Sequence, residues 1–247
     1  MRGPDGYFDE HIAARYDDDS AAEMFDPAVV APTVDLLAEL AGNGRVLEFG
    51  VGTGRIALPL AQRGVSVHGI DMSNAMVKRL RTKPGGDGVG VTIGDFAATR
   101  VDGSFSLVYV VFNTIMNLRT QAAQVACFRN AADHLEPGGC FVVEVMVPEL
   151  QRVPPGERHR VFKASENYWG IDEYDVDTQS LTSHHLVIDD GTADAFEFPG
   201  RYVWASELDL MAQLAGMRLR VRWGGWKREP FTSDSDTHVS VWEKPET

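Results

Sequence analysis

The chain has 247 residues, of which 44% are hydrophobic and 24% are charged. This composition suits a globular protein with one large core and excludes a disordered or fibrous chain. Acidic residues outnumber basic ones by 36 to 23, and a net charge of -13 disfavours nucleic acid as a partner. The chain has two cysteines, no apolar run long enough for a membrane span and no signal-peptide core, so we expect a cytoplasmic protein without membrane contact.

The front half of the sequence alternates predicted strands with predicted helices. Short apolar runs predict strands over 45–49, 65–70, 91–93, 105–112 and 140–147. Helical spacing of apolar residues predicts helices over 31–41, 54–63, 74–82 and 120–135. Ser73 is the expected cap of the third of these helices, and Pro137-Gly138-Gly139 is an expected turn. This alternation predicts a mostly parallel sheet that helices cover on both faces.

After Pro148 the pattern changes to two-residue alternation with turn signals such as Asp190-Gly191, which predicts antiparallel hairpins between 158 and 203. A helix from Ser206 to Gly216 and strands near 217–224 and 237–243 are expected to follow. The predicted fold class is therefore α/β. It is a Rossmann-like, seven-stranded, mostly parallel sheet with helices on both faces, plus an inserted antiparallel β layer.

Polar residues and glycines gather where three predicted strands end. The first strand ends at Glu48 and runs into a loop with glycines at every second position, 50, 52 and 54, where backbone can approach a ligand closely. Asp71 and Asp95 end the next two strands, and open α/β sheets bind ligands at this edge. Asp71 suits ribose hydroxyls, and Asp95 suits an adenine amino group, with Met72 and Phe96 beside the base. Together these residues predict a nucleoside site.

Four segments resemble the signature set of class I S-adenosylmethionine-dependent methyltransferases: Glu48–Gly54, Gly69–Met72, Gly94–Phe96 and Leu135–Gly139. The resemblance covers about residues 7–147. It implies S-adenosylmethionine as cofactor, with the glycine loop beside the methionine part, and it places Phe112-Asn113 near the transferred methyl. It also makes Tyr16 and Arg55 candidates for the cofactor carboxylate. The implied cofactor-binding residues are Tyr16, Glu48, Gly50, Gly52, Gly54, Arg55, Asp71, Met72, Asp95, Phe96, Phe112 and Asn113.

The implied reaction is methyl transfer to an N or O atom of a small-molecule acceptor, with secondary metabolism as one setting. The later part of the chain is distantly similar to actinobacterial sugar-amine N-methyltransferases. We therefore expect an N-terminal helical lid over 1–30, a methyltransferase core over 31–148 and 204–247, and an inserted substrate-binding subdomain over 149–203. Aromatic residues of this later part are expected to wall the acceptor pocket: Tyr168, Trp169, Tyr174, Tyr202 and Trp204.

A hydroxyl acceptor would need a base, and the catalytic candidates are His184, His185 and Tyr202. Because neighbouring residues on a strand face opposite sides, only one of the two histidines can face a pocket. No metal site is predicted, since Asp17-Asp18-Asp19 lacks a second ligand group and is typical of a solvated face. Cys127 and Cys140 are expected in the core.

Three other functions fit parts of the pattern. They are a nucleotide-cofactor oxidoreductase on a Rossmann fold, a protein that binds S-adenosylmethionine without transferring methyl, and a protein of this fold that performs another cofactor-dependent reaction such as a cyclisation. The glycine spacing differs from that of dinucleotide-binding loops, which disfavours the oxidoreductase. An exposed edge of the antiparallel layer would also allow pairing into a homodimer.

Overall fold

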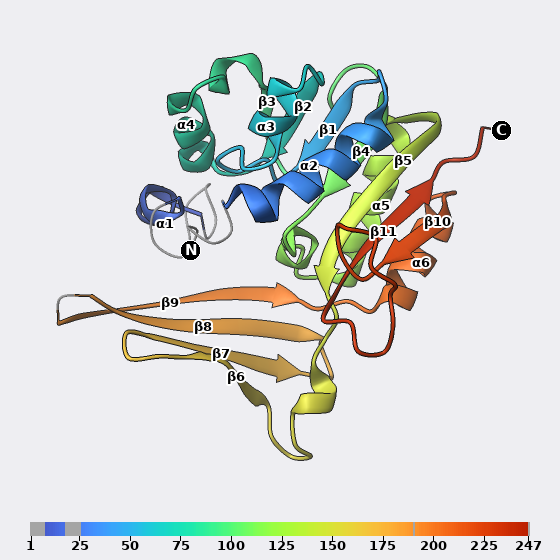
Figure 1. Ribbon diagram of the computed structural model, residues 1–247. Helices are drawn as coiled ribbons and strands as arrows, with labels where there is room; N and C mark the ends of the chain where they lie inside the picture. Colours follow the sequence, from blue (N-terminus) through green and yellow to red (C-terminus); the bar gives the residue numbers. More distant parts are fainter. Residues whose placement is uncertain (1–7, 18–25, 190, 247) are drawn as a thin grey trace.

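The computed structural model describes residues 8–17, 26–189 and 191–246, and its strands form two separate sheets (Figure 1). The larger sheet has seven strands in the order β10-β11-β5-β4-β1-β2-β3. Its strands are β1 Val46–Phe49, β2 Val67–Asp71, β3 Gly90–Ile93, β4 Phe105–Val110, β5 Leu135–Met146, β10 Arg218–Trp223 and β11 Thr237–Glu243. Strands β1 to β5 pair in parallel, whereas β11 is antiparallel to both β5 and β10. The predicted seven-stranded, mostly parallel sheet is confirmed.

Helices cover both faces of this sheet and create two cores. Alternate residues along each strand face opposite sides, as Val108 and Tyr109 do on β4. One core lies under α2 and α3, and the other lies under α5 and α6. The helices are α1 Glu10–Arg15, α2 Pro27–Ala41, α3 Ala57–Gln62, α4 Asn74–Thr82, α5 Gln121–His134 and α6 Ala205–Leu214, and short 3-10 turns are η1 Gly86–Gly88, η2 Thr114–Asn117 and η3 Leu150–Arg152. Cys127 and Cys140 are both buried, as predicted.

Local chemistry explains where elements differ from the sequence prediction. Helix α2 begins at Pro27 rather than at 31, because the Asp26 carboxylate accepts a hydrogen bond from Ala28 N (2.7 Å) and proline fits a first turn. Strand β5 begins at Leu135, so the expected turn at Pro137-Gly138-Gly139 lies within the strand. Gly138 has φ +79°, and the pairing with β4 is irregular there, which is how the strand accommodates these residues.

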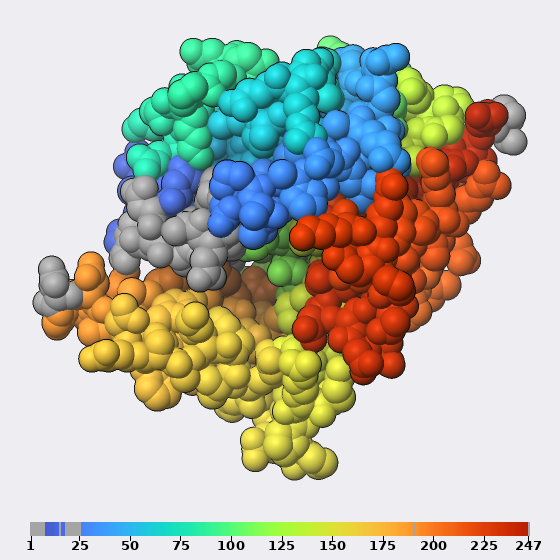
Figure 2. Space-filling model, viewed as in Figure 1, coloured from blue at the N-terminus to red at the C-terminus, as the bar shows by residue number. Residues whose placement is uncertain are grey.

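The smaller sheet is an antiparallel layer of β6 His159–Ala164, β7 Tyr168–Asp175, β8 Ser180–Asp189 and β9 Thr192–Arg201, paired in chain order. It lies beyond the carboxyl ends of β1 and β4 (Figure 1), and the space-filling view shows a hollow between it and the larger body (Figure 2). Arg201, at the end of β9, is 5% exposed and donates to Gln124 on α5 and Glu207 on α6. This buried network fixes one end of the layer to the core.

Within the part of the chain that the structure describes, we find no helix with the length and apolarity that crossing a membrane requires.

Candidate active site

The backbone conformation of the loop after β1 explains why this loop contains three glycines. Gly50, Gly52 and Gly54 have φ of +75°, +52° and +83°, a left-handed region that other residues adopt at a cost. A Cβ on Gly50 would lie 2.6 Å from Thr114 Cγ2, which is shorter than a van der Waals contact. Glycine therefore lets this loop pack directly against η2, at the carboxyl ends of β1 and β4.

Asp71 faces the glycine loop rather than solvent. Its Oδ2 accepts from Gly52 N (2.7 Å) and its Oδ1 accepts from Ser73 N (2.8 Å). Burial raises the pKa of this carboxyl, although backbone hydrogen bonds oppose the shift. Met72, next in sequence, is 47% exposed and therefore does not fill the core. Asp71 and Met72 thus place a carboxylate and an apolar side chain beside the glycine loop.

Glu48 lies deeper, beneath the same loop. It is 3% exposed and accepts a hydrogen bond from the Tyr109 hydroxyl (2.7 Å). Burial raises the pKa of Glu48 to about 8, with Tyr109 and Arg55 opposing the rise. The guanidinium of Arg55 stands over the ring of Phe112, 4.5 Å from its centroid. Arg55 thus connects the buried acid with the segment after β4.

Strands β2 and β3 end side by side, and Asp95 lies in the turn that follows β3. Gly94 N donates to the Asp71 carbonyl (2.8 Å), and Asp95 Oδ1 accepts from Ala97 N (2.8 Å), which orders the turn. Phe96 is 8% exposed and stacks on Phe49, with ring centroids 5.7 Å apart. Most of the Phe96 ring therefore belongs to the core, and only its edge approaches Gly50.

The two residues after β4 adopt a strained backbone. Phe112 and Asn113 both have φ +59°, which is uncommon for residues other than glycine. Strand β5 holds them from the side: the Glu144 carboxylate accepts from Phe112 N (2.8 Å), and Met146 N donates to Asn113 Oδ1 (2.7 Å). Such strain persists only where neighbours fix it, and it is frequent at active sites.

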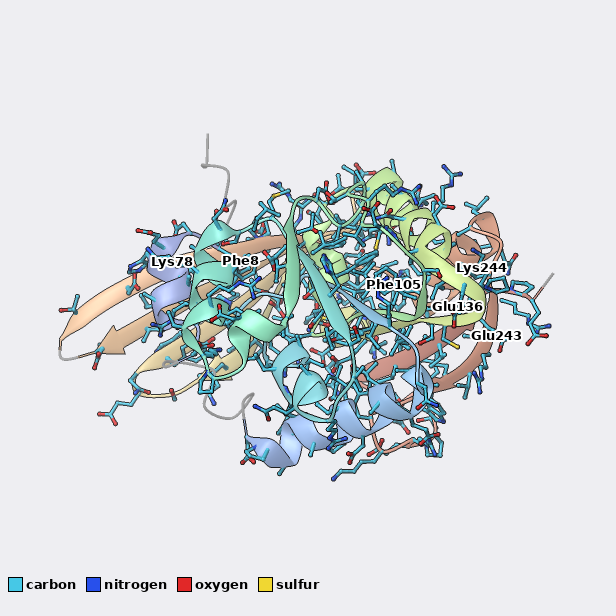
Figure 3. All side chains as sticks on the ribbon, turned by 90° about the horizontal axis from the view of Figure 1, so that it is seen from above. Phe8, Lys78, Phe105, Glu136, Glu243 and Lys244 are labelled. Carbon is cyan, nitrogen blue, oxygen red and sulfur yellow. The ribbon has the colours of Figure 1, made fainter. Side chains whose placement is uncertain are left out.

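Helix α1 covers the glycine loop from the other side. Asp17 accepts from the Thr53 hydroxyl (2.8 Å) and pairs with Lys83 Nζ (2.8 Å), so it is not the solvated acid that the sequence suggested. Asp18 and Asp19 lie outside the described residues. Figure 3 shows Phe8 and Lys78 together where α1 lies against α4. Burial raises the pKa of Tyr16, which also feels the charges of Arg55 and Asp71.

A cavity of about 880 Å³ separates the core from the antiparallel layer. Helix α1 and the residues that flank it contribute Phe8, His11 and Tyr16 to its lining, and the core contributes Phe112 and Asn113. The inner face of the layer contributes the remaining main wall: Phe162, Tyr168, Asp172, Leu181, Ser183, His185, Val187, Asp194, Phe196 and Phe198. Figure 2 shows the hollow between the layer and the larger body. The cavity therefore begins at the strained segment and extends along the layer.

The structure places the three catalytic candidates in different surroundings. His185 lines the cavity, where its Nδ1 lies 2.6 Å from the Tyr168 hydroxyl and burial lowers its pKa to about 4. His184 lies on the opposite face, between Glu173 and Glu197. Tyr202 is 2% exposed and packs on Tyr174 in the core. Among the described residues that line the cavity, His185 is thus the only one of the three candidates.

Several residues of this region escaped sequence reasoning. Phe162, Phe196 and Phe198 form the unpredicted part of the aromatic wall, beside Tyr168, which was expected there. Of the other expected aromatic residues, Trp169 is 47% exposed and outside the cavity lining, and Tyr174 is buried. Asp17 and Glu144 were also missed as partners of the site. The even spacing of Phe196 and Phe198 on one strand was the available signal, but the sequence did not show which face would turn inward.

Comparison with known proteins identifies the class. A family model described as "Methyltransferase domain" matches residues 46–139. The structure of the CcbJ methyltransferase from Streptomyces caelestis is 35% identical, covers 97% of this chain and 98% of its own, and superposes with a TM-score of 0.86. The chain therefore belongs to the class I S-adenosylmethionine-dependent methyltransferases.

Two further methyltransferases are similar to this chain over most of its length. The cypemycin N-terminal methyltransferase of a Streptomyces species is 28% identical over 237 residues, which are 92% of this chain and 97% of the relative. CalS10, an amino pentose methyltransferase from Micromonospora echinaspora solved with S-adenosylmethionine bound, is 21% identical, covers 95% of both chains and has a TM-score of 0.66. The latter likeness shows the shared fold.

Proposed function

We propose that this protein transfers a methyl group from S-adenosylmethionine to an N or O atom of a small-molecule acceptor held in the 880 Å³ cavity. The main support for the proposal is that the candidate cofactor site and the cavity are next to each other. The glycine loop and Asp71 lie on one side of the strained Phe112-Asn113 segment, and the cavity begins on the other side. A cofactor and an acceptor bound on these two sides would meet at this segment.

The residues present fit the nucleoside part of the cofactor. Asp71 carries two oxygens, and each accepts one backbone hydrogen bond, which leaves acceptor capacity for ribose hydroxyls. The exposed Met72 offers an apolar surface for a base. Asp95 follows β3, whose end is bonded to Asp71, and is the proposed partner of the adenine amino group.

The methionine part would lie along the glycine loop. Positive φ angles at Gly50, Gly52 and Gly54 turn the backbone there without side chains. The positive charge of Arg55 lowers the pKa of Tyr16 against the larger effect of burial, and these two side chains are the proposed contacts of the cofactor carboxylate. The bound cofactor supplies an activated methyl on sulfur, so the chain mainly aligns the acceptor with it and excludes water.

The protein's own groups define which acceptors react. An amine attacks through a neutral lone pair, whereas a hydroxyl gives up a proton as it reacts. The neutral imidazole of His185, oriented by the Tyr168 hydroxyl, is the candidate base inside the cavity. The cypemycin N-terminal methyltransferase is by name an N-methylating relative, which makes nitrogen the first acceptor atom to test. Cytoplasmic location and homodimer formation stay predictions from the sequence.

Calorimetric titration with S-adenosylhomocysteine tests the cofactor assignment. We expect Asp71→Ala to weaken binding about tenfold or more, because the ribose hydrogen bonds are charge-assisted. Unchanged affinity in the folded variant would remove Asp71 from the site. Methyl transfer itself is checked by mass spectrometry across amine and hydroxyl acceptors, as a product heavier by one methylene. Cofactor binding with no such product would favour a binding protein instead.

A further inference from the structure

One carboxylate in the cavity has no role in the cofactor site. Asp172, on β7, is 6% exposed and lines the cavity, and its Oδ1 accepts a hydrogen bond from the Ser183 hydroxyl (2.5 Å). Over the described ranges, no cationic nitrogen lies within 4.0 Å of it. Arg160, its cross-strand neighbour, forms its ion pair with Glu149. Burial raises the pKa of Asp172, and the Ser183 hydroxyl and the charges of Arg160 and His184 oppose this rise from their places on the layer. A buried carboxylate without a paired cation is costly, so it is a specific site for one.

Aromatic rings line the same cavity as this carboxylate. Phe198, cross-strand from Ser183, stacks on Phe8, just before α1, with ring centroids 5.8 Å apart. Phe196 stacks on the imidazole of His185 at 4.9 Å, with the planes 8° apart. Aromatic faces attract cations, and they exclude the water that would screen a charge.

Phe162 adds to this aromatic lining from the edge strand β6. A Cβ on Gly170 would lie 2.3 Å from the Phe162 ring, so the absence of a side chain on β7 is what allows the ring to cross over it. The same ring meets His185 edge-on at 5.5 Å. Gly170 therefore leaves the room that the Phe162 ring occupies in the cavity wall.

The other charges on the cavity lining do not neutralise Asp172. Burial lowers the pKa of His185 to about 4, so its imidazole is neutral at pH 7. His11 lies 3.5 Å from Asp194, one hairpin farther along the layer. Lys163 is exposed on the edge strand. The interior of the cavity thus has acidic and aromatic character.

The register of the layer sets the distance from the reacting centre. Gly200 lies against η2, where a Cβ would be 3.1 Å from the Met116 carbonyl, and η2 directly follows Phe112-Asn113. Leu181 pairs with Gly200, and Ser183 with Asp172 lies two residues farther out. Two residues along a strand span about 7 Å. A group bound by Asp172 is therefore several bonds away from the atom that receives the methyl.

We propose that Asp172, with Ser183 and the rings of Phe198 and Phe196, binds an ammonium group of the acceptor that is distinct from the atom methylated. An ammonium paired with a carboxylate has no free lone pair, so it anchors the acceptor rather than reacting. This inference rests on the proposed function for its reacting centre, and it narrows the acceptor class to molecules with a second, protonated amine.

The test uses two small probes of the same shape, 2-phenylethylammonium and the neutral 2-phenylethanol, titrated by calorimetry with and without saturating S-adenosylhomocysteine. We expect the wild-type protein to bind the ammonium about tenfold more tightly than the alcohol. Asp172→Asn should bring the ratio of the two affinities close to one, and Asp172→Ser should do the same. The matched control Glu173→Gln removes a carboxylate from the opposite face of the same strand, where it pairs with His184, and should keep the preference.

Equal affinities in the wild type, no binding of either probe, or a preference retained in Asp172→Asn would each overturn the proposal. S-adenosylhomocysteine affinity in the same series reports on the proposed function separately. A preference for the ammonium in a protein that binds no S-adenosylhomocysteine would leave the ammonium site standing and contradict the methyltransferase site. Normal cofactor affinity in Asp172→Asn shows that the variant is folded.

Discussion

The carboxylate of Asp17, just after helix α1, accepts a hydrogen bond from the hydroxyl of Thr53, in the middle of the glycine loop (2.8 Å). Thr53 is 1% exposed, and its carbonyl accepts from Lys83 Nζ (2.9 Å), which also pairs with Asp17. The N-terminal helix is therefore fastened to the same loop that we propose to bind the cofactor. On its other side α1 reaches the antiparallel layer through Phe8 and Phe198.

This connection predicts that loosening α1 weakens cofactor binding. Asp17→Ala removes a largely buried hydrogen bond and an ion pair, and we expect S-adenosylhomocysteine affinity to fall about fivefold to tenfold. Hydrogen exchange of residues 10–15 should become faster in the variant. The control is Lys78→Ala, which removes an exposed pair with Glu10 (3.5 Å) on the same helix interface and should change neither quantity. Equal effects of the two variants would argue against a specific role for Asp17.

Glu144 is predicted to be a positioning residue for the reacting centre. Its carboxylate accepts a hydrogen bond from Phe112 N and so helps to hold the strained Phe112-Asn113 backbone in place. We expect Glu144→Ala to lower kcat about tenfold or more while the KM for S-adenosylmethionine changes little, because we propose that the segment borders the transferred methyl rather than the nucleoside. Glu144→Gln keeps an acceptor oxygen and should restore most of kcat. A rise in KM alone would instead indicate a role in cofactor binding.

The raised pKa of Glu48 predicts that the stability of the folded protein depends on pH. Its pKa is raised to about 8 in the folded protein, chiefly by burial, and lies near 4.3 in unfolded chains. Between these values the unfolded chain releases a proton that the folded protein keeps. The stabilisation from this group is therefore complete below about pH 4 and is lost as pH rises through 8.

Glu48→Gln stays neutral and can still accept from Tyr109, so it should remove this dependence. We expect the variant to be more stable than the wild type at pH 8, by on the order of 2 kcal/mol, and the difference to shrink toward pH 5. Urea unfolding across this range measures it. A difference in the free energy of unfolding that does not vary with pH would show that Glu48 is ionised in the folded protein.

The sequence predicted the central strands β1, β2 and β4 well because they are largely buried on both faces and therefore read as short apolar runs. Ser73 also caps α4 as expected, accepting from Met76 N (3.1 Å). The inner face of the antiparallel layer was harder, since His184 and His185 give the same local signal and only register decides which one faces the cavity. Asp17 looked like one acid in an exposed run, because its partner Thr53 is 36 residues away in sequence. Contacts between distant segments are what the pattern could not supply.

The most direct test of the central claim is a crystal structure of the protein with S-adenosylhomocysteine. We predict that ribose hydroxyls lie within hydrogen-bond distance of the Asp71 carboxylate and that the homocysteine follows the loop from Gly50 to Gly54. The sulfur should point past Phe112 into the cavity. A ligand bound elsewhere, or an Asp71 carboxylate that keeps only its bonds to Gly52 and Ser73 while the ligand passes it by, would contradict the account.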